Sequence, residues 1–220
     1  IELPKLSSNL FIGRTKSGFS MNKVMTGYYG WTHERPAASD AMLPILADGV
    51  KWLGYLPKHG LNWSVGWYGD SYSARESFST MDNEEVARVS WLPIRSDLGH
   101  TLLHLGVSLR HGQPEDDQLR LRSGPESFQA PYVVDTGVFS ADSIDMAGLE
   151  AYYRRGAVLI GSEVFVQNVD SASTGNPGFN GGEVFVSSNV TGEARPYKPA
   201  RGYFIAVSPS RPVGQGGPRQ

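Results

Sequence analysis

Residues 101–123 read TLLHLGVSLRHGQPEDDQLRLRS, and this stretch decides how the chain is interpreted. Apolar side chains hold every second position at Leu103, Leu105, Val107 and Leu109, with His104, Gly106, Ser108 and Arg110 between them. The alternation resumes after a polar turn at 111–117, where Leu119 and Leu121 alternate with Arg120 and Arg122. A period of two predicts strands, and two such runs predict a β-hairpin. An apolar face backed by an arginine-bearing face is typical of a membrane barrel.

Composition narrows the class of protein further. A chain of 220 residues can bury one sizeable core, and 26 glycines with 11% aromatic residues favour an all-β domain over a helical bundle. The net charge of −2 indicates no nucleic-acid partner. The chain has no Cys, which excludes thiolate catalysis and cysteine-ligated zinc. It has no run of about 18 apolar residues, so no transmembrane helix is predicted, whereas barrel strands give a weaker hydropathy signal.

Other segments repeat the alternating pattern, and about ten strands are predicted, at the regular spacing of sandwiches and barrels. The remaining candidates are 9–15, 50–57, 61–69, 86–94, 132–139, 144–154, 157–169, 182–191 and 201–207. Short turns at 58–60 and 95–99 alternate with long loops at 70–82 and 170–181. Outer-membrane barrels show this asymmetry between tight periplasmic turns and longer extracellular loops.

The segment 17–49 has no sustained period, apart from one predicted helical turn at 21–25. Irregular connections of this length are uncommon and are usually functional or disordered. A cluster of aromatic residues argues against disorder: Phe19, Tyr28, Tyr29 and Trp31. We therefore expect a folded loop that packs against the rest of the protein.

Several phrases, in order along the chain, resemble the phosphate-selective porin O and P family. Ile12–Phe19 (IGRTKSGF) resembles the family's Gly-Arg-Phe-Lys strand end, and Thr32–Arg35 (THER) resembles its Met-Glu-Arg loop. His104–Ser108 followed by Leu119–Glu126 (LRLRSGPE) resembles its Leu-Gly-x-Ser and Arg-Phe-Arg-Ser-x-Pro-Glu phrases. The later matches are Asp135–Gly137, Gly148–Glu150 and Thr191–Tyr197.

This resemblance implies an antiparallel transmembrane β-barrel of sixteen strands in the bacterial outer membrane, usually a homotrimer embedded in the lipid bilayer. Its third extracellular loop folds inward and narrows the pore, and 17–49 would correspond to this constriction loop. The chain, taken as a single β-barrel domain over 1–220, is about half the family's length. It ends in Gly214–Gln220 rather than in a closing aromatic residue. We therefore expect a central portion of a longer porin, the alternative being a complete barrel of about ten strands.

Seven basic residues are candidates for lining the pore and binding small anions such as phosphate. Arg88, Arg110, Arg120 and Arg122 lie on the inferred inward parity, and motif position adds Arg14, Lys16 and Arg35. A ring of partly dehydrated cations lowers the entry cost of an anion, and the arginine fork suits phosphate oxygens. The alternative is that they are solvated charges balancing acids such as Glu84, Glu150 and Glu163. Arg14 shares its parity with Ile12, so strict alternation would place it on the lipid side.

No enzyme, cofactor or metal site is predicted. His100 and His104 would lie roughly 13 Å apart on a strand, too far for one metal ion. The sequence has no nucleophile elbow, phosphate loop or His-Glu-x-x-His motif. Two alternatives to an anion-conducting porin remain. One is a soluble all-β module that binds carbohydrate or another small ligand, and the other is a porin-like barrel acting as a structural partner in an envelope assembly.

Overall fold

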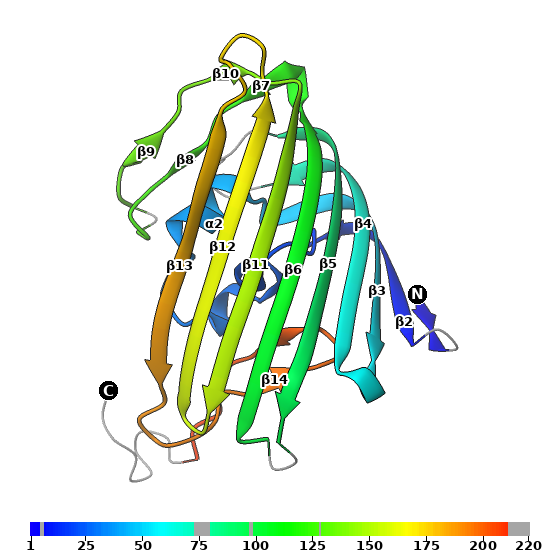
Figure 1. Ribbon diagram of the computed structural model, residues 1–220, viewed down its shortest axis with the longest axis vertical. Coiled ribbons are helices and arrows are strands. Elements are labelled where there is room, and N and C mark those ends of the chain that lie inside the picture. Colours follow the sequence, from blue (N-terminus) through cyan, green and yellow to red (C-terminus); the bar gives the residue numbers. More distant parts are fainter. Residues whose placement is uncertain (5–6, 73–79, 97–98, 128, 211–220) are drawn as a thin grey trace.

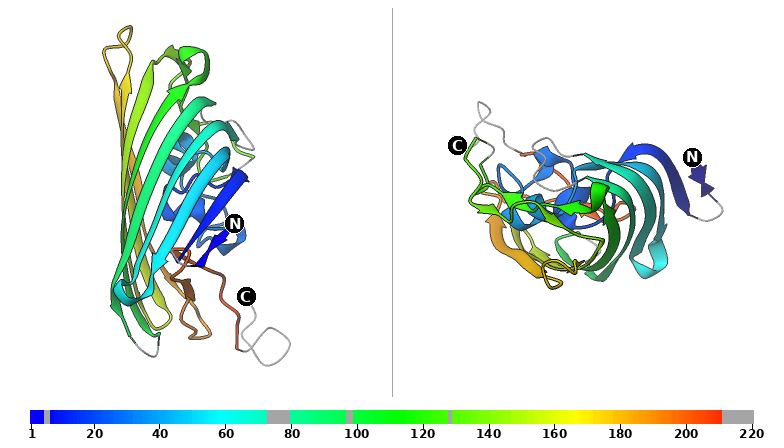
Figure 2. Two further views of the ribbon diagram at one scale, coloured as in Figure 1. Left: turned by 90° about the vertical axis from the view of Figure 1, so that its right-hand side faces the viewer. Right: turned by 90° about the horizontal axis from the view of Figure 1, so that it is seen from above.

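One strongly curved antiparallel sheet dominates the computed structural model, which describes residues 1–4, 7–72, 80–96, 99–127 and 129–210 (Figures 1 and 2). The predicted C-terminal turn at 214–220 lies outside these residues. In spatial order the strands are β1 (Glu2–Leu3), β2 (Ser8–Thr15), β3 (Leu46–Leu56), β4 (Leu61–Tyr72), β5 (Met81–Arg95), β6 (Thr101–Pro114), β11 (Ser143–Arg155), β12 (Val158–Asp170) and β13 (Gly178–Ser188). The all-β prediction is confirmed.

Strand β6 shows why the sheet has two unlike faces. Leu105, Val107 and Leu109 are 38–59% exposed on the outer face, whereas His104 and Arg110 are buried on the concave face. The parity predicted for this stretch is therefore confirmed. The same alternation continues along β11 and β12, where every second residue is buried.

The hairpin predicted for 101–123 is wrong in its second arm. Strand β6 pairs with β5 and β11, in a register that runs from Ile144↔Gly112 to Arg155↔Thr101. After β6 a 3-10 turn, η4 (Glu115–Asp117), carries Asp116 and Asp117 at positive φ, and the chain that follows it leaves the main sheet. The long, regular β11 takes the place beside β6 because its alternation matches that strand over its whole length.

Three of the predicted strands, at 118–123, 132–139 and 201–207, do not join the main sheet. Two-residue strands are found in these regions instead, and they pair into three small ribbons. These are β7 (Gln118–Leu119) with β10 (Phe139–Ser140), β8 (Arg122–Ser123) with β9 (Val134–Asp135), and β14 (Tyr197–Lys198) with β15 (Tyr203–Phe204).

The two ends of the sheet differ in their connections. At the lower end in Figure 1 the strands are joined by the short turns 57–60, 96–100 and 156–157, the first of them containing the 3-10 turn η3 (Pro57–His59). At the upper end the connections include 16–45, 115–142 and 171–177. The predicted alternation of short turns with longer connections is confirmed for these connections, and we call the two ends the short-turn end and the long-loop end. The long loop predicted at 70–82 lies largely outside the described residues, and the one predicted at 170–181 spans only 171–177 because β13 begins at Gly178.

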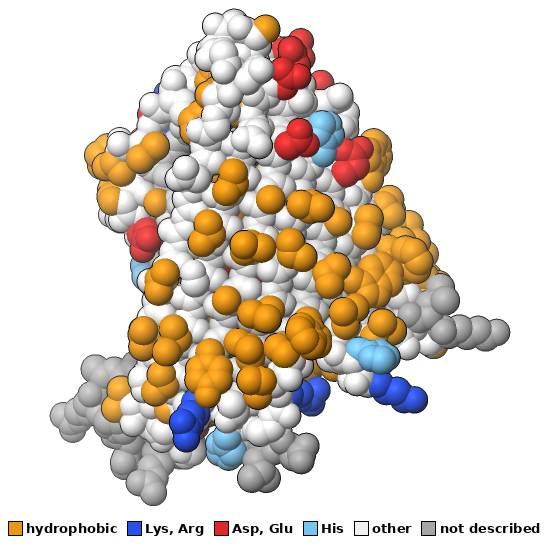
Figure 3. Space-filling model, viewed as in Figure 1, with side chains coloured by type: hydrophobic (Ala, Val, Ile, Leu, Met, Phe, Trp, Pro, Cys, Tyr) orange, Lys and Arg blue, Asp and Glu red, His pale blue; other side chains and the backbone are white. Residues whose placement is uncertain are grey.

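The outer face carries a broad apolar band (Figure 3). Soluble monomers rarely expose contiguous apolar patches larger than a few hundred Å². The exposed apolar side chains on the central strands include Trp52, Val65, Trp67, Val89, Trp91, Leu105, Val107, Leu109, Leu149, Ile160, Val164 and Val166. This surface matches a barrel wall facing lipid and fits a soluble module poorly.

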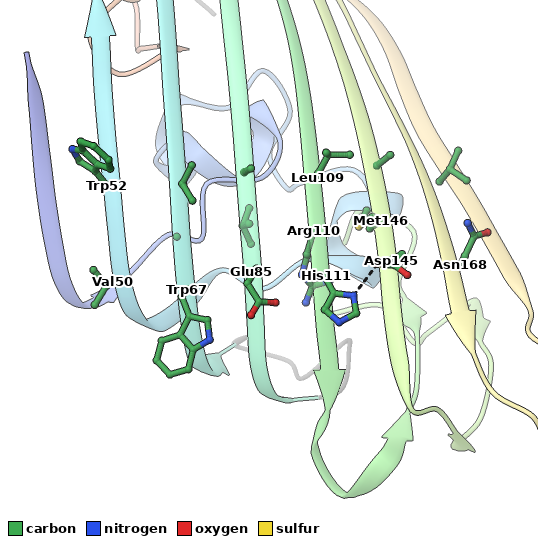
Figure 4. Close-up of a pocket in the computed structure, with 16 residues that line it drawn as sticks. Val50, Trp52, Trp67, Glu85, Leu109, Arg110, His111, Asp145, Met146 and Asn168 are labelled. Atoms are coloured by element: carbon green, nitrogen blue, oxygen red, sulfur yellow. Dashed lines mark hydrogen bonds and ion pairs between the residues drawn. The ribbon is translucent and has the colours of Figure 1, made fainter. Parts of the chain in front are cut away.

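Polar residues bound the band at the long-loop end. Glu85, His111 and Asp145 are registered neighbours on the outer face, and His111 Nδ1 lies 2.8 Å from Asp145 Oδ1 (Figure 4). They edge a shallow hollow of about 650 Å³ whose floor includes Ala87. Along β6, Thr101 and His111 are roughly 33 Å apart at about 3.3 Å per residue. A strand tilt of about 40° reduces this to about 25 Å, the height of a barrel's apolar band.

The concave face is covered by two segments of the chain. The first, 16–45, contains α1 (Met21–Val24), the 3-10 turn η2 (Gly27–Tyr29) and α2 (Ala37–Met42), and it lies within the curve of the sheet (Figure 2). The helical turn predicted at 21–25 is confirmed, whereas α2 was not predicted. The irregular segment ends at residue 45 rather than 49, because β3 continues through a bulge at Asp48/Gly49. The second segment, 196–205, carries β14 and β15.

The sheet is open over the residues that the structure describes. Strands β1 and β13 lie at its two edges and do not pair with each other. Closure into a barrel and a count of sixteen strands therefore stay predictions. In the same described residues, no helix has the length and apolar character needed to cross a bilayer.

The apolar band generates a stability prediction. Val107→Arg places a charge near the middle of the band and should lower the free energy of unfolding by about 2–4 kcal/mol if this face contacts lipid. The control, Gln113→Arg, lies on the same parity beyond His111 and should cost less than about 1 kcal/mol. Urea unfolding of protein reconstituted in lipid vesicles measures both. Equal, small losses in the two variants would contradict a lipid-facing surface.

Candidate functional site: a basic cavity on the concave face

The start of the 16–45 segment is fixed to the wall by polar contacts. The hydroxyl of Tyr68 on β4 donates to the carbonyl of Ser17 at 2.6 Å, and Lys51 Nζ on β3 donates to the carbonyl of Lys16 at 2.7 Å. Gly18 has φ 102°, and a Cβ there would lie 3.1 Å from Ser64 Oγ. Glycine is therefore required where the chain turns down against β4.

Apolar packing holds the next part of the segment. The ring of Phe19 is fully buried, and its centroid lies 5.9 Å from that of Phe165 on β12. Met21 and Met25 pack with Tyr152 and Phe204, which joins the segment to the β14–β15 ribbon as well as to the wall. The core of this protein thus lies on the concave side of the sheet.

The β14–β15 ribbon is held to the wall by polar side chains of β4, β5 and β6. Arg88 donates to the carbonyl of Gly202 at 3.0 Å, and Asn62 donates to the carbonyl of Ala200 at 3.1 Å. The hydroxyl of Tyr197 lies 2.7 Å from His104 Nδ1. The ribbon therefore closes one side of the space beneath the 16–45 segment.

Between the wall, the segment and the ribbon lies a cavity of about 180 Å³ with four basic side chains in its lining. None of the described residues that line it is acidic. The lining comprises Phe11, Thr15, Lys16, Gly18, Val24, Thr26, Lys51, Leu53, Asn62, Ser64, Arg88, Arg201 and Tyr203. Hydroxyl and amide donors among four cations form a suitable environment for a small oxyanion.

The positive charge around the cavity affects the pKa of Lys16, whose Nζ donates to the carbonyl of Met25. Burial, together with the positive charges of Arg35 and Lys51, lowers the pKa of Lys16 to about 8. Lys51 Nζ and the guanidinium of Arg201 lie 5.3 and 5.4 Å from the ring centroid of Phe11. An anion in this cavity would therefore relieve repulsion among cations.

A second basic group lies within the segment. Lys23 is 2% exposed, and its Nζ has no hydrogen-bond partner among the described residues. Burial lowers its pKa to about 7, although Asp40, with Oδ1 3.9 Å away, opposes the shift. Arg35 Nε donates to the carbonyl of Asn22 at 3.0 Å and borders a smaller pocket of about 90 Å³.

The structure brings together only some of the seven residues predicted to line a pore. Lys16 and Arg88 line the basic cavity, and Arg35 borders the smaller pocket. Arg88 Nε and NH2 each donate to Glu150 at 2.7 Å, and Arg110 pairs with Glu84 at 2.6 Å. Both arginines are inward as predicted, but both are buried in ion pairs beneath the segment.

The other three predicted residues lie outside the cavity. Arg14 shares the outward parity of the 69%-exposed Ile12 and pairs with Asp48 at 2.6 Å. Arg120 pairs with Asp135 at 2.6 Å in the loop after β6, and Arg122 lies 4.4 Å from the ring centroid of Tyr132. The parity argument fails for these two arginines because their segment does not join the sheet.

Sequence reasoning missed Lys23, Lys51 and Arg201. Lys51 could have been found, since it sits between Val50 and Trp52 on the inward parity of a predicted strand. Arg201 reaches the cavity only through the return of the ribbon from the short-turn end. Among the described residues, no group of three or more potential ligands is arranged to hold a metal ion.

Comparison with known proteins places the chain in a family. The family model for phosphate-selective porin O and P matches residues 5–215, which is nearly the whole chain. No curated protein gives a match. A curved antiparallel sheet with an apolar outer band and a polar concave face agrees with that family match. The chain therefore belongs to the phosphate-selective porin O and P family.

Proposed function

We propose that this chain forms the wall and the constriction of an outer-membrane channel. Small anions, phosphate among them, would diffuse through this channel. The observation that carries the proposal is the basic cavity, in which Lys16, Lys51 and Arg201 meet beside Arg88, whose own charge is paired with Glu150, and none of the described lining residues is acidic. Partly dehydrated cations attract anions, while separate sites let them leave. The family match supports a porin located in the outer membrane and gives no support to an enzyme.

In this proposal the 16–45 segment acts as the constriction loop. It starts at the long-loop end of β2, lies within the curve of the sheet, and contributes Lys16 to the cavity. Its exposed side chains, among them Thr26, Thr32 and His33, would then face the remaining passage. Arg88 and Arg110 would act beneath the loop by shaping the local field.

The proposal includes closure of the barrel by further strands of a longer polypeptide. The outer edge of β13 has no partner strand in the described residues. Val184 and Val186 on this strand face outward, with 78% and 69% of their surface exposed, as expected for a strand that contacts lipid. An open edge is not tolerated in the hydrocarbon layer, because unpaired backbone groups there cost several kcal/mol each. Assembly into a homotrimer is part of the same proposal and rests on the family alone.

A structural role in an envelope assembly is the second candidate function. It is favoured by the amount of the concave face that the 16–45 segment and the β14–β15 ribbon cover with buried apolar side chains. The two functions differ in conductance, since only the first requires an open aqueous path. Absence of channel currents from the full-length protein would favour the structural role.

Charge selectivity tests the cavity directly. In planar bilayers under a KCl gradient, the full-length protein should show a reversal potential whose sign indicates that chloride is more permeant than potassium. Removing one unit charge about 4 Å from the ion path costs about 1 kcal/mol in a water-like medium, so Lys51→Gln should lower the anion-to-cation permeability ratio about fivefold. The exposed Lys58 offers a matched control, and Lys58→Gln should leave the ratio unchanged. Cation preference in the unmodified protein would refute the proposal.

The anion preference should also depend on pH. Lys16 is charged below its lowered pKa of about 8 and neutral above it, so the preference should fall as pH rises through about 8. Phosphate in the cavity would stabilise the protonated amine and should shift this fall to higher pH. Lys16→Arg should keep the preference at pH 9, because guanidinium stays charged. Reversal potentials between pH 6 and 10 measure the effect, and a flat profile for the unmodified protein would contradict it.

A further inference from the structure

Three glutamates lie side by side on the concave face. Glu150 on β11, Glu163 on β12 and Glu183 on β13 are directly registered partners. Glu163 is fully buried and Glu150 is 4% exposed. Carboxylates directly opposite one another on neighbouring strands destabilise a sheet, so each needs hydrogen-bond donors of its own.

The donors divide the row into two parts. Glu150 is satisfied by the wall, through Arg88 and through His104 Nε2 at 3.0 Å. Glu163 is satisfied by the 16–45 segment, since it accepts from Ser20 Oγ at 2.7 Å and from Asn22 Nδ2 at 2.8 Å. The backbone N–H of Met21 donates to the same carboxylate. Asn22 Nδ2 also donates to Glu183.

The segment is strained where it meets Glu163. Ser20 is fully buried with φ 68°, a left-handed conformation that is strained for a non-glycine residue. Its side chain also accepts from the backbone N–H of Asn22 at 3.1 Å. Such a conformation persists only where its surroundings hold it. The hydrogen bonds to Glu163 do so here, because Ser20, Met21 and Asn22 are their donors.

The same contact lies close to the basic cavity along the chain. Lys16 and Gly18, which line the cavity, precede Ser20 within one short stretch. Asn22 in turn accepts the hydrogen bond of Arg35 through its carbonyl. A change that frees Ser20 and Asn22 from the wall therefore displaces one side of the cavity and the support of Arg35 together.

We propose that Glu163 is a positioning residue that holds the 16–45 segment against the wall and so fixes the shape of the basic cavity. This inference rests on the proposed function for its consequence in transport, but not for the docking itself. A solvated charge balancing the wall arginines, the simpler alternative, does not fit a carboxylate with no exposed surface and three donors from one segment. Glu163, with Glu183 beside it, thus serves as the attachment point for the segment.

The docking can be measured without conduction by alkylation of a single introduced thiol. The 220 residues of this chain contain no cysteine, and any cysteine elsewhere in the full-length protein is first replaced by serine. Met21 is fully buried between segment and wall, and Met21→Cys introduces a small apolar thiol there. In the reconstituted full-length protein this thiol should react slowly with a water-soluble maleimide. Adding Glu163→Gln removes acceptor capacity and should raise the alkylation rate at least tenfold, with Glu163→Asp giving a smaller rise.

Two further variants keep the test decisive. Glu85→Gln removes an exposed outward carboxylate and should leave the alkylation rate unchanged. Asn22→Ala removes the donor to Glu163 and Glu183 from the side of the segment, and it should accelerate alkylation even if the Glu163 variants fold poorly. Circular dichroism of each variant establishes that the sheet is intact. An unchanged rate in folded Glu163→Gln and Asn22→Ala protein would overturn the inference.

Conductance separates this inference from the proposed function. Release of the segment should change the single-channel conductance at least twofold and reduce the anion preference, and Glu163→Asp should restore part of both. Faster alkylation in a protein that never conducts would support the docking role and refute the transport proposal. An unchanged alkylation rate in a protein that carries anion-selective currents would support the transport proposal and refute the docking role.

Discussion

An apolar outer face constrains every other part of this structure. Once alternate residues such as Leu105, Val107 and Leu109 are turned outward, the intervening His104, Ser108 and Arg110 must lie on the concave side. That side then needs partners for charged groups and cover for aromatic rings. The protein meets both needs with its own chain, because the 16–45 segment and the β14–β15 ribbon supply donors, acceptors and apolar contacts.

This arrangement explains why so many charged groups are buried here without forming an open charged wall. Arg88 with Glu150 and Arg110 with Glu84 are ion pairs whose members are almost fully shielded. Breaking such a pair leaves an uncompensated charge at a cost of about 3–5 kcal/mol. The pairs therefore fix the wall, whereas in the proposed channel cations with fewer acidic neighbours, such as Lys16 and Lys51, would be left to interact with a passing ion.

The segment and the wall depend on each other. Glu163 would be an isolated buried carboxylate without Ser20 and Asn22, and the strained Ser20 would lack its support without Glu163. Phe19 adds packing against Phe165 two residues further along the same strand. The basic cavity therefore has a fixed geometry on this side, because polar and apolar contacts hold the same short stretch of chain.

The amino-acid sequence alone predicts the all-β class, the two unlike faces and the alternation of short and long connections. Those features follow from a period of two and from local turn chemistry, and both act over a few residues. The family was recognised from a separate signal, the ordered phrases between Ile12 and Tyr197. Motif position and parity also singled out Lys16 and Arg88, and both line the basic cavity in the structure. Lys51 was within reach of the same parity argument.

The three-dimensional fold decided which strand lies beside β6 and which charges meet. The pairing of β6 with β11 displaced the stretch that carries Arg120 and Arg122, because a long regular partner offers more ladder bonds than a short run after a turn. The return of the ribbon brought Arg201 to Lys51, and the register of three strands brought Glu163 to Ser20. Contacts between residues more than a hundred positions apart leave no periodic signal in a sequence.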